Sequence, residues 1–126
     1  MLNPRFLSVD EGIQIHMDQI TRYGGSTGVR DADLLNSAVG MPQSGFGDQY
    51  LHSGIFEMAA AYLYHLVQNH PFIDGNKRVG AMAAFTFLKL NGFTLQAKES
   101  DFESLVLNVA QGKTGKAAIA EFFKKY

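Results

Sequence analysis

The sequence contains no cysteine, and this absence removes several kinds of chemistry at once. Disulfide bonds, thiolate metal sites and cysteine nucleophiles are all excluded. Because a chain without disulfides fits a reducing compartment, we expect a cytoplasmic protein. Residues 1–12, MLNPRFLSVDEG, agree with this expectation, since they lack the long apolar stretch of a signal peptide.

An excess of charge of either sign is also missing. The formal net charge is −1 at pH 7, and the longest runs of lysine or arginine are the pairs at 77–78 and 124–125. A basic surface that attracts nucleic acid or acidic lipid is therefore not indicated. The most apolar stretch, residues 54–68, contains Glu57 and His65 and is too short to span a bilayer. We expect neither a nucleic acid nor a membrane as a direct partner.

The residues that are present favour helices. The chain has 126 residues, 46% of them apolar, which fits one domain over residues 1–126 with one core. Apolar residues recur at helical spacing, and no alternation of strands with helices appears. We therefore predict an all-α fold, a bundle of about six helices. The predicted helices cover residues 9–23, 31–39, 55–69, 76–90, 100–112 and 114–125.

Local signals predict where these helices begin and end. Ser8 with Glu11, and Ser100 with Glu103, have the spacing of a capping box, in which two side chains satisfy free backbone N–H groups. Gly40 is expected to end the second helix in a left-handed conformation.

Residues 40–53, GMPQSGFGDQYLHS, are rich in glycine and polar groups. This composition predicts a flexible flap loop, and it supports mobility only. Phe46 and Tyr50 have two interpretations, anchoring of the loop to the core or presentation to a partner, and we expect the first. His52 is a weaker candidate for contact with a target or substrate.

Residues 69–81, NHPFIDGNKRVGA, gather polar groups between two apolar helices. His70, Asp74, Asn76, Lys77 and Arg78 all lie within nine positions. Any one of them has an ordinary structural interpretation, such as a turn residue, a helix cap or a surface ion pair. Their concentration in one loop favours a functional site.

The expected geometry of this stretch points to phosphate chemistry. Pro71 disfavours helix at the preceding residue, and Gly75 permits backbone angles that other residues avoid. A new helix then begins near Asn76, and its free N–H groups and positive dipole end form an anion site. Lys77 and Arg78 add two positive charges there.

The remaining two residues supply the other parts of a transfer reaction. Mg²⁺ is commonly held by one or two carboxylates together with substrate phosphates and water, which is a natural use for Asp74. The imidazole of His70 is suited to taking a proton from a hydroxyl. Phe72 is expected to anchor the loop to the core.

Other charged and titratable residues have simpler interpretations. His16 and His65 are expected to be structural, and no histidine spacing typical of a metal site is present. Glu57 has two interpretations. It is either a buried partner of Lys77 or Arg78, or a first-turn acid that suits the helix dipole.

Residues 70–78, HPFIDGNKR, resemble the signature of the Fic/Doc superfamily in its death-on-curing (Doc) branch. Residues 22–39 and 87–93 are similar to the same branch, so the resemblance covers nearly the whole chain. It implies a small all-α fold and the toxin of a toxin–antitoxin pair. It further implies that His70 is the general base, that Asp74 is the Mg²⁺ ligand, and that nucleotide phosphates contact a short run of residues, namely Gly75, Asn76, Lys77 and Arg78.

Two positions depart from the Fic enzymes that transfer AMP. Lys77 stands where those enzymes have glycine, and Ala81 stands where they have a second arginine. A bulky cation and the loss of a phosphate clamp disfavour the AMP-transfer geometry. The Doc branch shares these changes, and the resemblance implies a kinase that moves the γ-phosphate of Mg²⁺-ATP to a serine or threonine hydroxyl of elongation factor Tu and so blocks translation. A nucleotide transferase and a non-catalytic binding module are the alternatives.

The resemblance also raises the question of inhibition. Many Fic proteins carry an inhibitory helix, and residues 8–12 come close to its pattern but are one residue short. The capping box explains these residues better. We therefore expect control by a separate antitoxin, whose disordered tail folds into an apolar groove.

Overall fold

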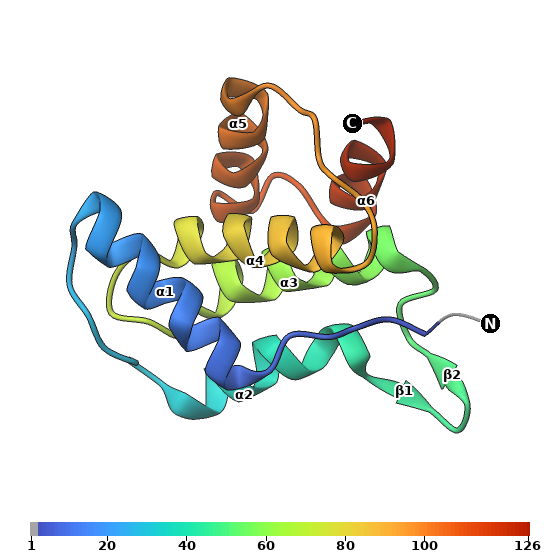
Figure 1. Cartoon of the computed structure of the whole chain (residues 1–126), viewed down its shortest axis with the longest axis horizontal. Helices are drawn as coiled ribbons and strands as arrows, with labels where there is room; N and C mark the ends of the chain where they lie inside the picture. Colours follow the sequence, from blue (N-terminus) through green and yellow to red (C-terminus); the bar gives the residue numbers. More distant parts are fainter. Residues whose placement is uncertain (1–2) are drawn as a thin grey trace.

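Six α-helices dominate residues 3–126, the part of the chain that the computed structural model describes (Figure 1). The all-α prediction is confirmed. The helices are α1 (Val9–Tyr23), α2 (Ala32–Gly40), α3 (Ile55–Asn69), α4 (Asn76–Leu90), α5 (Glu99–Ala110) and α6 (Lys116–Lys125). The remaining elements are a 3-10 turn, η1 (Met41–Gln43), and two short strands, β1 (Gly45–Phe46) and β2 (Gln49–Tyr50).

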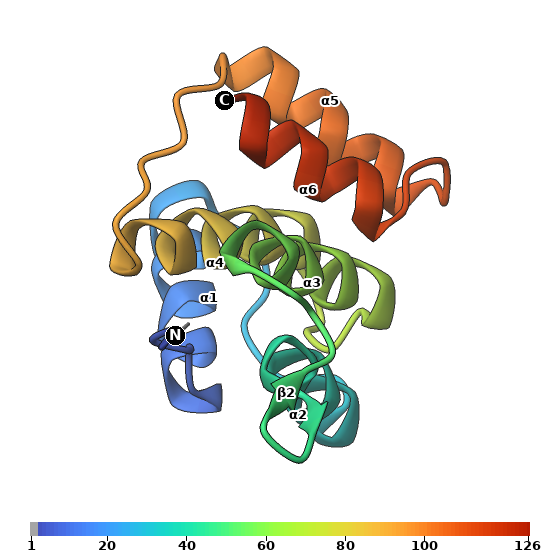
Figure 2. The same cartoon turned by 90° about the vertical axis from the view of Figure 1, so that its right-hand side faces the viewer.

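The helices form three layers, with α3 and α4 in the middle (Figures 1 and 2). Helices α1 and α2 lie on one side of this central pair, and α5 and α6 lie on the other. Helix α3 packs against α4, α6 and α2, and eight of its residues are buried. This explains why its sequence is apolar around most of its circumference.

A glycine permits the close approach of the two central helices. A Cβ atom at Gly80 of α4 would lie 2.8 Å from Val67 Cγ2 and 3.2 Å from the carbonyl oxygen of Leu63, both on α3. Any larger residue would push the helices apart at this point. The loop that connects α3 to α4 is thereby held at one end of a tightly packed pair.

Several local predictions can be compared with this fold. The capping box at Ser8 is confirmed, because Ser8 and Glu11 exchange both of its hydrogen bonds. The second capping box is wrong, since α5 begins at Glu99 and its N-cap residue, Lys98, makes no side-chain cap. Ser100 instead lies inside the first turn. Gly40 is also not a left-handed cap; it has helical angles (φ −79°, ψ −27°) and leads directly into η1.

Residues 40–53 contain more regular structure than expected. Strands β1 and β2 form an antiparallel hairpin in which Gly45 pairs with Tyr50 and Phe46 with Gln49. The expectation that Phe46 anchors the loop is wrong, because 93% of this residue is exposed. His52 is buried at 8% exposure, so it is not presented to a target. Within residues 3–126, no helix is both long and apolar enough to cross a membrane.

Candidate functional site

The loop between α3 and α4 begins with a strained histidine. His70 ends α3 with left-handed backbone angles (φ 48°, ψ 52°), and it is the only non-glycine residue at positive φ in residues 3–126. Such angles cost free energy and are common at functional sites. The His70 side chain is exposed, whereas Phe72, two residues on, is 1% exposed. The anchoring role predicted for Phe72 is confirmed.

A separate segment, residues 28–31, holds the loop from outside. The backbone N–H groups of Arg30 and Asp31 donate to the Pro71 carbonyl at 2.7 and 3.1 Å. The N–H of Ile73 donates to the Gly28 carbonyl at 3.1 Å, so the two segments pair like short antiparallel strands. The loop shape therefore depends on residues about forty positions earlier in the chain.

Asn76 fixes the loop from within. Its Oδ1 accepts the Phe72 N–H at 3.0 Å, and its Nδ2 donates to the Phe72 carbonyl at 3.0 Å. Nδ2 also lies 3.4 Å from Nδ1 of His70. The side chain is 7% exposed, so it organises the loop. Its side-chain amide is therefore occupied within the loop, whereas its backbone N–H donates to no described residue.

The N-terminus of α4 leaves donors available. The N-cap residue, Gly75, has left-handed angles (φ 78°) and provides no side-chain cap. Among the described residues, no hydrogen bond uses the N–H groups of Asn76, Lys77 and Arg78. These three donors lie at the positive end of the helix dipole, a geometry suited to an anion, and phosphate binding there stays a prediction.

Asp74 lies beside this anion site. Its Oδ1 accepts the Gly75 N–H at 2.8 Å and its Oδ2 accepts the Ser26 N–H at 3.1 Å. These backbone hydrogen bonds, with a smaller effect from Arg78, lower the pKa of Asp74 below its ordinary value. The carboxylate is therefore charged at neutral pH.

The glycine-rich turn after α1 packs closely on Asp74. A Cβ atom at Gly25 (φ 119°) would lie 2.6 Å from Asp74 Oδ2 and 3.0 Å from an Arg78 nitrogen. The turn therefore does more than end α1. It brings the Ser26 N–H to the carboxylate.

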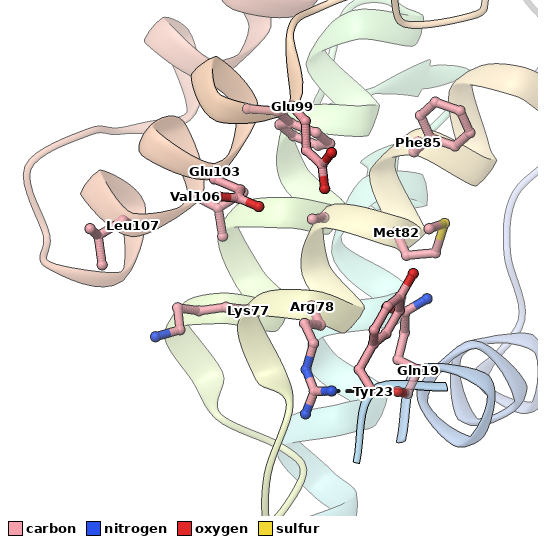
Figure 3. A pocket seen from close by; sticks show the side chains of 12 residues that line it. Gln19, Tyr23, Lys77, Arg78, Met82, Phe85, Glu99, Glu103, Val106 and Leu107 are labelled. Carbon is pink, nitrogen blue, oxygen red and sulfur yellow. Dashed lines mark hydrogen bonds between the residues drawn. The ribbon is translucent and has the colours of Figure 1, made fainter. Parts of the chain in front are cut away.

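The two cations at the start of α4 have different surroundings. Arg78 Nη1 donates to the Gly24 carbonyl at 2.9 Å and approaches the Gln19 carbonyl at 3.4 Å. Its charge thus sits at the C-terminal end of α1, which favours cations. Lys77 is exposed and forms no ion pair with any described residue. Their side chains leave α4 in different directions (Figure 3).

Two residues outside the predicted set shape this loop. His16 of α1, 2% exposed, stacks on Phe72 with ring centroids 3.9 Å apart, and its Nε2 lies 2.7 Å from the Asp74 carbonyl. The position of His16 on the buried face of α1 is the signal that could have indicated this contact. Arg30 donates to the Asn69 and His70 carbonyls, and nothing in the local sequence distinguishes it from a surface arginine.

A cavity of about 600 Å³ opens next to Lys77 and Arg78, between α1, α4 and α5 (Figure 3). Its walls are mainly apolar and aromatic, and acidic side chains of α5 point toward α4. His70 and Asp74 are not part of the lining. The lining residues are Gln19, Tyr23, Lys77, Arg78, Ala81, Met82, Phe85, Glu99, Phe102, Glu103, Val106 and Leu107.

Glu57 and the other two histidines lie away from this loop. Glu57 pairs with Lys124 of α6 at 2.7 Å, so the proposed pairing with Lys77 or Arg78 is wrong and its place in the first turn of α3 is confirmed. Lys116 Nζ lies 3.2 Å from Nε2 of both His52 and His65. Neither cluster contributes to the candidate site.

Comparison with known proteins gives consistent relatives. Residues 6–88 match the Fic/DOC family. The chain is 43% identical over 75 residues to Toxin Doc of Mycolicibacterium smegmatis (strain ATCC 700084 / mc(2)155). This match covers 60% of the chain and 58% of the mycobacterial protein. It is 30% identical over 122 residues to Protein kinase doc of Escherichia phage P1, which covers 96% of this chain and 94% of the phage protein. The matched regions include the loop between α3 and α4.

Proposed function

The chain belongs to the Fic/DOC family, and from this premise we propose that it is a Doc-type toxin with protein kinase activity. In this proposal it transfers the γ-phosphate of ATP to a serine or threonine hydroxyl of a translation factor of the elongation factor Tu type. Translation would stop, and a cognate antitoxin would hold the toxin in check.

The observation that carries the proposal is the uncapped N-terminus of α4. The N–H groups of Asn76, Lys77 and Arg78 donate to no described residue, and they follow a left-handed Gly75. The Lys77 side chain leaves the same turn of α4, is exposed and forms no ion pair with any described residue. Donors and charge together are suited to the oxygens of a nucleotide phosphate.

Asp74 supports a role for Mg²⁺. No group of three histidine, aspartate or glutamate residues within residues 3–126 could hold a metal by itself. Each Asp74 oxygen accepts one backbone hydrogen bond and keeps lone-pair capacity for a second contact. A single carboxylate that shares the ion with phosphates and water is a common Mg²⁺ arrangement. When bound, the ion would neutralise the charge that develops on the transferred phosphate.

The exposure of His70 supports its proposed role as the base. Its imidazole is exposed at the entrance of the loop, where a target hydroxyl can approach. In the proposed reaction the hydroxyl oxygen attacks the γ-phosphorus, its proton passes to His70, and ADP leaves. The protein supplies mainly position and charge, as in other phosphoryl transfers.

The cavity beside Lys77 and Arg78 supports binding of a nucleoside. Aromatic side chains such as Tyr23 and Phe102 offer surfaces for a base, and the Gln19 amide offers both a donor and an acceptor. The phosphates of a nucleotide bound here would extend toward the start of α4.

Control by a separate antitoxin is supported by the structure of residues 8–12. Ser8 and Glu11 are engaged with each other, and Glu11 also pairs with Arg5 at 3.1 Å. The Glu11 carboxylate is therefore occupied by its own helix cap and by Arg5.

A transfer assay tests the proposal. Purified protein with Mg²⁺ and elongation factor Tu is incubated in parallel with α-labelled and γ-labelled ATP, and again with bacterial extract. Label is expected only from γ-labelled ATP, and it is expected to disappear with His70→Ala. Lys77→Ala should weaken ATP binding, whereas Lys89→Ala, at the exposed far end of the same helix, should leave it unchanged.

Other outcomes would contradict the kinase proposal. Label from α-labelled ATP would establish nucleotide transfer instead. No label from either donor, with unaltered toxicity of His70→Ala in cells, would establish a binding module.

A further inference from the structure

Arg30 makes hydrogen bonds to three consecutive carbonyls at the end of α3. Its Nε donates to His70 at 2.7 Å, its Nη2 donates to Asn69 at 3.0 Å, and its backbone N–H donates to Pro71 at 2.7 Å. The C-terminal end of a helix has unsatisfied carbonyls and a partial negative charge, so a guanidinium is well suited to this place.

Three of the other five helices in the described residues end in a different way. Helix α1 is followed by Gly24 (φ 83°), α4 by Gly92 (φ 94°) and α5 by Gly112 (φ 75°), each at or just after the cap. Glycine adopts these angles without steric strain. Helix α3 instead places His70 at φ 48°, where a Cβ atom is unfavourable.

This contrast gives Arg30 a specific task. Glycine would adopt this left-handed conformation without strain, but a glycine could not display an imidazole. The hydrogen bonds of Arg30 act on the carbonyl of the strained residue itself and on those of its two neighbours. They therefore stabilise the left-handed conformation that sets the direction of the His70 side chain.

We propose that Arg30 is a positioning residue for the transfer reaction, holding His70 in the left-handed conformation from which its imidazole meets the target hydroxyl. The inference rests on the proposed role of His70 as the base. Arg30 touches neither nucleotide nor target in this account. Its effect should therefore fall on the rate of the chemical step and not on ATP binding.

A double-mutant cycle tests whether Arg30 stabilises the left-handed backbone conformation of His70, and it needs no assay of activity. The free energy of unfolding is measured by urea denaturation for the wild type, Arg30→Gln, His70→Gly and the double variant. Glycine accepts left-handed angles without help. Arg30→Gln should therefore destabilise the wild type more than it destabilises His70→Gly. Equal losses in the two backgrounds would mean that Arg30 is an ordinary helix cap and would overturn the inference.

Transfer kinetics test the functional part. For Arg30→Gln we expect kcat to fall roughly ten- to hundred-fold, as for a misplaced catalytic group, with the KM for ATP little changed. Arg30→Lys, which retains one donor group, should recover part of the loss. The control is Arg22→Gln, because Arg22 is also an exposed arginine but pairs only with Asp18 on α1.

The outcomes separate this inference from the proposed function. An unchanged kcat in Arg30→Gln, measured on an active wild type, would overturn it. The wild type could also lack transferase activity while the double-mutant cycle shows that Arg30→Gln costs less stability in His70→Gly. In that case the proposed function fails, but the stabilisation of the His70 conformation by Arg30 remains supported.

Discussion

His16 shows how one side chain on a distant helix shapes the functional loop. A carbonyl oxygen can only accept a hydrogen bond, so the 2.7 Å contact with Asp74 requires a hydrogen on His16 Nε2. The same ring covers Phe72 in parallel stacking. His16 thus fixes both the buried anchor of the loop and the peptide group that precedes Gly75.

Substitution of His16 can separate these two contacts. His16→Phe keeps an aromatic ring against Phe72 but loses the hydrogen bond, and we expect a loss of about 1 kcal/mol in the free energy of unfolding. His16→Ala also removes the stacking and leaves a cavity, so its loss should be about 2–4 kcal/mol. Urea unfolding measures both. Equal stability of His16→Phe and the wild type would show that the hydrogen bond contributes nothing.

For single residues, the sequence indicated which side chains share the loop between α3 and α4 but not what each of them contacts. The spacing of His70, Asp74 and Lys77 in one short loop was enough to predict a site. The inward orientation of Asn76 could not be predicted, because its partner is the Phe72 backbone in a loop whose shape was unknown. The engagement of Arg78 with Gly24, 54 residues away, depends on tertiary packing that no local pattern contains.

Helix ends give a matched pair of serines. Ser8 caps α1 through a confirmed capping box, whereas Ser100 lies in the first turn of α5 and caps nothing. Ser8→Ala should lower the free energy of unfolding by about 1 kcal/mol. Ser100→Ala should change it by less than about 0.5 kcal/mol. Thermal and urea unfolding of the two variants measure the difference, and equal losses would contradict the assignment.

Glycines within helices give a second pair. Gly80→Ala would place a methyl group 2.8 Å from Val67 Cγ2, so we expect a loss of about 1–3 kcal/mol. Gly40 has helical angles, and nothing lies within 4 Å of a Cβ atom built there. Gly40→Ala should therefore stabilise the protein by about 0.5–1 kcal/mol. Destabilisation by Gly40→Ala would indicate that the left-handed cap expected from the sequence forms in solution.

Helices were predicted well because their signal is repeated over many residues. The ranges predicted for α3 and α4 agree with the structure, since apolar spacing and the flanking proline and glycines all point to the same limits. The errors at Gly40 and Ser100 have a common origin. A single residue type is compatible with more than one backbone conformation, and the neighbouring elements decide between them.

Across the whole molecule, a histidine pair links the central layer to α6. Burial, and then the nearby Lys116 ammonium, lower the pKa of His65 from 6.5 to about 4, and the same two causes lower the pKa of His52. Both rings are therefore neutral in the folded protein at neutral pH. The unfolded chain, with an ordinary histidine pKa, binds more protons as the pH falls.

This difference predicts an acid-dependent loss of stability. The contribution of His65 should be complete above pH 6.5 and should decline as the pH falls toward 4. The loss should be about 1–2 kcal/mol, since solvent screening at a half-buried site reduces the full effect. Urea unfolding between pH 7 and pH 4 should show a shallower decline for His65→Gln than for the wild type. Identical slopes would mean that His65 does not carry the effect.

The residues that hold the loop between α3 and α4 from outside all precede it in the sequence, so they are synthesised first. Every residue that shapes the loop from outside, namely His16, Ser26, Gly28 and Arg30, leaves the ribosome before His70 does. The wall of the nearby cavity formed by Phe102 and Val106 on α5 leaves it later. Since a domain generally folds as a unit, the loop and the cavity wall are expected to take their final shape together. The last third of the chain thus completes this cavity only near the end of its own translation.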